Sequence, residues 1–153
     1  MTLKELSQLY YLNREIEMDQ ARLAELQSRV GIAAQQIDGM PHATGNGESK
    51  VEKTALEIVD LQAIIAAKQI QCIHERARLE RYIASIPDSL TRMIFTYRFV
   101  NGLSWAQVTD CIGGDNKEES IKKTCYRYLD KTENEKIFVL YQWDTDTLAL
   151  AES

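Results

Sequence analysis

Apolar residues recur at steps of three and four along the first 86 residues and form two separate stripes. The first stripe comprises Leu9, Leu12, Ile16, Leu23, Leu26, Val30, Ala33 and Ile37. The second comprises Ile58, Leu61, Ile65, Cys72, Leu79, Tyr82 and Ile86. Because residues three and four apart lie on one face of an α-helix, this pattern predicts two long amphipathic helices, the first running from Leu3 to Ile37.

The segment between the stripes predicts that the two helices pair as a hairpin. Residues 38–50, DGMPHATGNGESK, contain three glycines and a proline and show no helical period, which is typical of a loop. Two helices of similar length joined by one loop fold back on each other as an antiparallel coiled coil. Pro87 then ends the second helix. Since two helices alone bury little apolar surface, we expect the hairpin to self-associate, with a dimer favoured.

Polar residues interrupt both stripes. Asp19 occupies a position in the first stripe that would suit an apolar side chain, and Lys68 and Glu75 do so in the second. A polar residue at such a position can fix the register of a coiled coil at some cost in stability. Asp19 can equally lie at a partly exposed edge, and the sequence leaves both interpretations open.

After Pro87 the pattern changes to three shorter helices. Asp88 is a suitable N-cap for the first of them, which ends at Asn101-Gly102. Its expected core side consists of Met93, Ile94, Tyr97 and Phe99. Ser104 opens the second helix, with Gln107 in the position of a capping box. The expected inward-facing residues of this helix are Val108, Cys111 and Ile112.

The last two short helices are joined by a glycine-containing turn. Gly113-Gly114 ends the second helix, and Asn116 can serve as N-cap for the third, which runs from about Lys117 to Lys131. The inward face of the third helix is expected to be Ile121, Cys125, Tyr128 and Leu129. Three short helices in this order are typical of a helix-turn-helix domain.

The chain as a whole is therefore predicted to be all-α, with three parts. Residues 1–87 form a long antiparallel coiled-coil hairpin, and residues 88–136 form the helix-turn-helix domain. Residues 137–153 form a tail that begins apolar and ends acidic. The pattern allows this tail to be a strand, a helix end or a docking peptide.

Composition limits the possible partners. The chain has 18 basic and 23 acidic residues, a net charge of −5, so it does not attract nucleic acid over its whole surface and any DNA binding must be local. No apolar run is long enough to cross a membrane, and acidic residues lie near the N-terminus where a signal peptide would be basic, so a cytoplasmic protein is expected. The three cysteines lack CxxC spacing, which favours reduced thiols.

The outward face of the third short helix is the candidate DNA-binding surface. Its candidate residues are Lys117, Glu119, Ser120, Lys122, Lys123, Tyr126, Arg127 and Lys131. Lys and Arg can neutralise phosphates or reach guanine edges in the major groove, and Tyr126 can contact a phosphate or a thymine methyl. Glu118 and Glu119 suit the positive end of a helix dipole but would repel phosphates, although a Glu can also accept a hydrogen bond from cytosine. A merely solvated charged face explains the same charges equally well.

The spacing of the remaining candidate residues does not indicate a metal site or a catalytic site. Trp105 is expected to be a core aromatic residue beneath the turn, and His42 a surface residue of the loop. Cys72 and His74 are two positions apart and point to different sides of a helix, so they do not form a metal site. The sequence contains no constellation that would indicate a catalytic site, so we expect a non-enzymatic protein that binds no cofactor and no metal.

Several motifs together resemble a known family. They are GMPHATG between the long helices, IPDS, RFVNGLSWAQV, the pattern IGG-x-N-x-E-x-S-I-K-K, and YRYL, in that order. Across residues 4–131 the chain resembles small proteins of phages and prophages of Gram-positive bacteria, which are similar at the C-terminus to region 4 of sigma factors and to the ArpU/RinA-type late transcription regulators. The turn GGDNKEES is longer and more acidic than the usual one, and the tail lies beyond the resemblance.

This resemblance implies a sigma-region-4-like helix-turn-helix that binds promoter or operator DNA, with host RNA polymerase as a further possible partner. Two other interpretations remain open at this point. The chain can be a DNA-packaging scaffold that resembles the small terminase subunits, or a protein-binding module that has the helix-turn-helix shape without contacting DNA. Ring-sized oligomers would favour the packaging scaffold.

Overall fold

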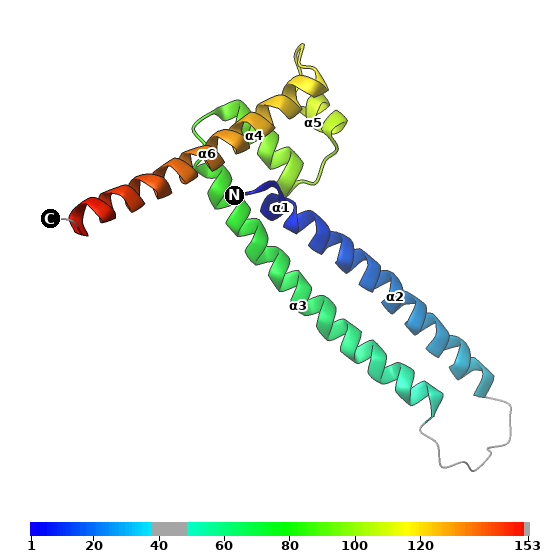
Figure 1. Ribbon diagram of the computed structural model, residues 1–153. Helices are drawn as coiled ribbons and strands as arrows, with labels where there is room; N and C mark the ends of the chain where they lie inside the picture. Colours follow the sequence, from blue (N-terminus) through cyan, green and yellow to red (C-terminus); the bar gives the residue numbers. More distant parts are fainter. Residues whose placement is uncertain (38–48, 152–153) are drawn as a thin grey trace. The chain divides into compact units, whose positions relative to one another are not determined.

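The computed structural model describes the backbone of residues 1–37 and 49–151, with side chains described for residues 1–33, 35 and 49–135. The expected loop at 38–50 lies almost wholly outside this range, and so does His42. Every element in the described part of the chain is helical, which confirms the predicted all-α class. The elements in order are α1 Leu3–Leu6, α2 Gln8–Ile37, α3 Lys50–Ala84, α4 Ser89–Phe95, the π-helical turn η1 Thr96–Val100, α5 Trp105–Ile112 and α6 Glu118–Ala151 (Figure 1).

The chain divides into two compact units, which are described separately. Residues 11–74 form one unit, made of most of α2 and the greater part of α3. Residues 1–10 and 75–153 form the other, which contains α1, the end of α3 and all of α4 to α6.

The first predicted helix is interrupted near its start. Instead of one helix from Leu3 to Ile37, α1 ends at Leu6 and α2 begins at Gln8. Both the backbone N–H and the hydroxyl of Ser7 donate hydrogen bonds to the carbonyl of Leu3, at 3.0 and 2.9 Å. A serine side chain competes with the helix for backbone acceptors in this way, and the hydrophobic period alone does not reveal it.

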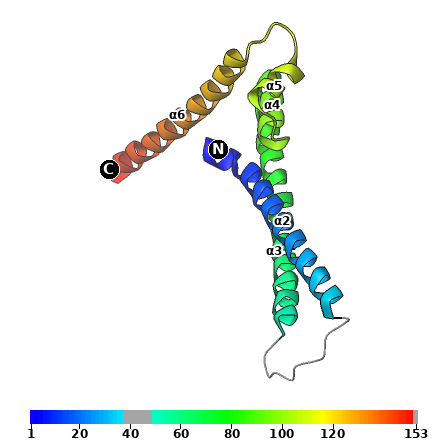
Figure 2. The same ribbon diagram turned by 90° about the vertical axis from the view of Figure 1, so that its right-hand side faces the viewer.

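The unit of residues 11–74 is a pair of antiparallel helices whose apolar stripes meet. Both views show α2 and α3 side by side (Figures 1 and 2). The buried core of the pair is Ile16, Leu26, Leu61 and Ile65, with Leu23, Ile58 and Cys72 packed against it. These residues all belong to the two predicted stripes, so the inner faces of both helices are as expected.

The polar interruptions of the two stripes pair with each other. The ammonium of Lys68 lies 2.6 Å from a carboxylate oxygen of Asp19 and 3.3 Å from one of Glu15. The side chains of Asp19 and Lys68 are only 22% and 24% exposed. The hydrogen bond to Asp19 raises the pKa of Lys68 above its ordinary value. Since each charge has its partner on the facing helix, a shifted register would leave both without one.

The core of the other unit is centred on Phe95. Its ring packs against Phe99, Tyr128 and Tyr82 at centroid distances of 5.3, 5.6 and 6.4 Å. The fully buried side chains of this unit are Leu6, Leu79, Ile86, Ile94, Phe95, Val108, Ile121 and Cys125. Burial raises the pKa of Cys125 to about 12, so this thiol stays protonated and acts as a small apolar residue.

Two residues predicted to face inward are exposed instead. Met93 is 39% exposed, and the buried residue of this helix that the prediction missed is Phe95. The buried residues of α4 are Thr91, Ile94 and Phe95, which share one face at the regular i, i+3 and i+4 spacing, and Met93 lies on the other side of the helix, about 200° from Thr91. The π-helical turn η1 follows this face, and in it the N–H of Asn101 donates to the carbonyl of Thr96 at 3.0 Å. Cys111 is also exposed, and Val108 is the buried residue of α5.

The predicted helix caps at Asp88 and Ser104 are confirmed. A carboxylate oxygen of Asp88 accepts hydrogen bonds from the N–H of Thr91 at 2.8 Å and from its hydroxyl at 2.6 Å. Ser104 and Gln107 form the reciprocal bonds of a capping box at the start of α5. The hydroxyl and N–H of Thr91 lower the pKa of Asp88 below its ordinary value of 3.8.

Replacing Asp88 with alanine should destabilise the chain in a pH-dependent way. A carboxylate whose pKa is lower in the folded state stabilises that state above the unfolded pKa and loses this contribution as the pH falls through the folded value. The difference in unfolding free energy between the wild type and Asp88→Ala should thus be constant above pH ~5 and shrink below pH ~4. Urea unfolding between pH 3 and 7 measures it, with Asp88→Asn as a cap that does not titrate. A difference independent of pH would contradict the role of the charge.

The third helix of the predicted helix-turn-helix is longer than expected. Instead of ending near Lys131, α6 continues to Ala151, so the backbone of residues 137–151 is helical. The chain has no glycine and no proline after Gly114, and nothing in this segment stops a helix once it has begun. Asn116 is not its N-cap, because α6 begins at Glu118. The amide nitrogen of Asn116 instead donates to the carbonyl of Gly113 at 3.0 Å.

Candidate nucleic-acid interface

The turn between α5 and α6 is built by two glycines. Gly113 and Gly114 have φ angles of +71° and +68°, which side-chain-bearing residues rarely adopt. The bond from the Asn116 side chain to the Gly113 carbonyl closes the turn. Both α4 and α5 pack against α6, so the start of α6 is held by two short helices. This arrangement fixes which face of α6 is buried.

The buried face of α6 is the one predicted from the spacing. Ile121, Cys125 and Leu129 are 2%, 0% and 7% exposed. Seven of the eight candidate residues are exposed, namely Lys117, Glu119, Ser120, Lys123, Tyr126, Arg127 and Lys131. Lys122 is half-buried beside them. The structure therefore brings the predicted residues together on the outer side of one helix.

The charges on this face differ in whether they are already paired. Lys122 forms an ion pair with Glu118 one turn earlier, and Lys131 lies 3.8 Å from Glu135. The side chains of Lys117, Lys123 and Arg127, by contrast, form no hydrogen bond or ion pair with any residue whose side chain is described. The pairing of Glu118 with Lys122 offsets one of the two acidic charges at the helix start, while Glu119 stays exposed. Three cations on this face are thus available to an anionic ligand.

Trp105, predicted to be a core aromatic residue, is not among the fully buried residues. It is half-buried, and its ring centroid is 6.1 Å from that of Tyr126 on α6. The guanidinium of Arg98 lies 5.0 Å from the Trp105 ring centroid and donates to the carbonyl of Leu103 at 2.7 Å. We call Arg98, Trp105 and Tyr126 the aromatic cluster. It ties Tyr126 to α5 and η1 and adds a fourth cation close to the outer face of α6.

Arg98 was missed by the sequence pattern. Regular helical spacing gives no reason to single it out, because its place depends on the π turn of η1. Arg98 and Trp105 lie on either side of the predicted turn at Asn101-Gly102, and this placement is the feature of the sequence that could have indicated their contact.

No family model, curated protein or solved structure matches this chain. Its function is therefore inferred from the geometry of α5, α6 and the residues around them.

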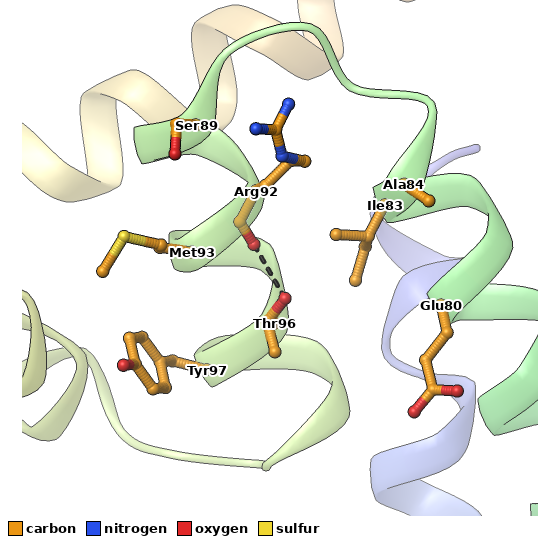
Figure 3. Close-up of a pocket in the computed structure, with 8 residues that line it drawn as sticks. All are labelled: Glu80, Ile83, Ala84, Ser89, Arg92, Met93, Thr96 and Tyr97. Atoms are coloured by element: carbon orange, nitrogen blue, oxygen red, sulfur yellow. Dashed lines mark hydrogen bonds between the residues drawn. The ribbon is translucent and has the colours of Figure 1, made fainter.

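A groove of about 380 Å³ lies between the end of α3 and the helical turns of α4 and η1 (Figure 3). Its lining residues are Glu80, Ile83, Ala84, Ser89, Arg92, Met93, Thr96 and Tyr97. The carboxylate of Glu80 is paired with Arg76 at 2.9 Å, and the guanidinium of Arg92 donates to the carbonyls of Ile86 and Pro87. Its charged groups are thus already engaged, and the groove suits an apolar side chain better than a reacting group.

In the part of the chain that the structure describes, no group of three or more His, Cys, Asp or Glu side chains lies close enough to hold a metal ion. Cys72 instead has its sulfur 3.5 Å from the side-chain oxygen of Asn13. None of the described helices combines the length and apolar character needed to span a bilayer.

Proposed function

We propose that this protein is a non-enzymatic DNA-binding transcription regulator of phage or prophage type, with a sigma-region-4-like helix-turn-helix formed by α5 and α6. The observation that carries the proposal is the outer face of α6, where Lys117, Lys123 and Arg127 are exposed and unpaired among the described residues. This helix follows a glycine turn and is held by α4 and α5, as the second helix of such a motif must be if it is to enter the major groove.

Each residue of the face has a role that its chemistry allows. Lys123 and Arg127 are one helical turn apart and reach phosphates or guanine edges, and Lys117 and Lys131 contact the backbone at the two ends. Tyr126 donates to a phosphate or touches a thymine methyl, with its ring held by Trp105. The hydroxyl of Ser120 contacts phosphate, and Glu119 accepts a hydrogen bond from cytosine. Lys122, already paired with Glu118, flanks the contact.

In this proposal the antiparallel pair of α2 and α3 is a coiled-coil arm that serves oligomerisation or recruits a partner. Host RNA polymerase is the partner that the sigma-like resemblance suggests. The apolar groove formed by the end of α3, α4 and η1 offers a place for an apolar side chain of such a partner. The near neutrality of the helix-turn-helix part favours weak nonspecific binding, so recognition depends on the few cations of α6.

The experiment that tests the proposal combines mass measurement with DNA retention. The purified chain is incubated with a fragment library of prophage DNA at about 150 mM salt, where nonspecific phosphate binding is weakened, and the retained fragments are sequenced. A dimer by light scattering that retains one short sequence, preferably two-fold symmetric, is the expected result. A ring-sized oligomer that retains packaging-site DNA would move the assignment to a small-terminase-like scaffold. No retained DNA would make the chain a protein-binding module and contradict the proposal.

A further inference from the structure

The helix α3 carries a second apolar stripe that faces away from α2. Its large members are Leu56, Val59, Ile70 and Ile73, which are 65%, 60%, 56% and 68% exposed. Ala63 and Ala66 complete the stripe and are also exposed. The six residues follow one another at steps of three, four, three, four and three, which is the a/d spacing of a coiled coil. We call these six residues the outer seam.

The outer seam is distinct from the stripe that packs on α2. The inner stripe runs through Ile58, Leu61 and Ile65. Each of these residues lies two positions after a residue of the outer seam. Because two positions correspond to about 200° around a helix, the two stripes lie on nearly opposite faces of α3. Polar residues normally cover the outer face of a surface helix, and a second heptad stripe there indicates that this face packs against another helix.

We propose that the outer seam is a self-association surface, and that two copies of this chain pair through it in antiparallel orientation about a two-fold axis between Ile64 and Ile65. Such an axis pairs residues whose numbers add to 129. Leu56 then meets Ile73 of the second copy, and Val59 meets Ile70. Ala63 meets Ala66 at the centre, where the small side chains let the two helices come close.

Polar residues on the flanks of the seam favour a second copy in this orientation. Asp60 and His74 flank the seam and are exposed, and they are too far apart along α3 for the imidazole N–H to donate to the carboxylate within one chain. In the antiparallel pair, Asp60 lies about one and a half turns from His74 of the second copy. The two side chains lean toward each other, because helical side chains point toward their own N-termini. On the other flank, Gln62 and Gln69 face each other without charge. A parallel pair would leave Asp60 opposite Ala55, with no partner.

This inference rests on the proposed function in that it names the surface through which the α2–α3 arm would oligomerise, but it does not depend on DNA binding. Its test is made on the full chain without DNA. The chain at about 100 µM should have twice its 17.5 kDa mass by light scattering. Ile70→Glu with Ile73→Glu should raise the dimer dissociation constant by about 100-fold or more, because two charges per chain would enter an apolar seam. Circular dichroism should be unchanged, since both side chains are more than half exposed in the single chain.

The matched control is Met18→Glu, which places the same charge at a 71% exposed apolar position of α2 that is not part of the seam. This variant should remain a dimer. A monomeric wild-type chain at 100 µM would overturn the proposal, and so would a dimer that Ile70→Glu with Ile73→Glu leaves intact. Loss of DNA binding with an intact dimer would contradict the proposed function and leave the seam established, so the two failures are distinguishable.

Disulfide trapping tests the orientation. Val59→Cys and Ile70→Cys are prepared separately in a Cys111→Ser background, because Cys111 is exposed. The antiparallel pair places residue 59 beside residue 70 of the second copy, whereas two residues 59 would lie about 16 Å apart along the axis, beyond the reach of a disulfide. A cross-linked dimer should therefore form only when the two variants are mixed. Efficient cross-linking of either variant with itself would overturn the antiparallel pairing.

Discussion

Replacing Lys123 and Arg127 together with alanine is expected to abolish specific DNA binding while leaving the helical content unchanged. Both side chains are exposed and unpaired among the described residues, so their removal breaks no contact of the fold. A side chain that contacts a base edge or phosphate contributes about 1–3 kcal/mol, so the double change should weaken binding by at least about 30-fold. Fluorescence anisotropy with the retained DNA sequence measures the affinity, and circular dichroism measures the helicity.

The control for this variant removes the same charge elsewhere. Arg22 and Lys50 are exposed on α2 and α3, and replacing both with alanine changes the net charge by the same two units. If binding depended only on overall charge, the two double variants would lose affinity equally. If the outer face of α6 contacts DNA, only the variant with Lys123→Ala and Arg127→Ala should lose affinity for DNA, and the control variant should not. Undiminished binding by that variant would show that another surface contacts DNA.

Replacing Phe95 with alanine is expected to lower the free energy of unfolding of the unit that contains α4, α5 and α6 by about 3–5 kcal/mol. The ring is completely buried and contacts aromatic side chains from α3, η1 and α6, so its removal leaves a cavity where these elements meet. Because small domains are stable by only about 5–15 kcal/mol, this loss is a large part of the total. Urea unfolding followed by circular dichroism measures the effect.

Met93 supplies the matched comparison for Phe95. It lies two positions earlier on α4 and is 39% exposed, so Met93→Ala should cost about 1 kcal/mol or less. The sequence analysis places Met93 rather than Phe95 in the core, so the two substitutions distinguish the predicted buried face of α4 from the one in the structure. A larger loss for Met93→Ala than for Phe95→Ala would contradict the buried face described for α4.

Local signals in the sequence account for much of the fold. The caps at Asp88 and Ser104 and the stop at Gly113-Gly114 are short-range features, because each depends on bonds within about four residues. The inner faces of α2, α3 and α6 follow from helical spacing, which survives folding wherever the helix is regular. The outward residues of α6 could be chosen from sequence for the same reason.

The features that the sequence did not reveal depend on contacts distant along the chain or on departures from regular helix. The pairing of Lys68 with Asp19 joins residues 49 positions apart, and the stripes show only that each interrupts its own helix. Arg98 lies in the π turn η1 beside Trp105, and regular helical spacing does not predict this position. Phe95, by contrast, shares a regular helical face with Thr91 and Ile94, so its burial was visible in the spacing. The length of α6, unlike these features, could have been predicted from the sequence, because the chain contains no glycine or proline after Gly114 that would end a helix.

Photo-cross-linking from the outer face of α6 tests the central claim most directly. A benzophenone amino acid is placed at Tyr126, which is 41% exposed beside Trp105, and in a second preparation at the exposed Gln20 of α2. Each preparation is irradiated with the retained DNA at about 150 mM salt. We expect position 126 to cross-link to DNA and position 20 not to. DNA cross-linked from position 20 alone, or from neither position while the complex is intact, would contradict the assignment of α6 as the DNA-reading helix.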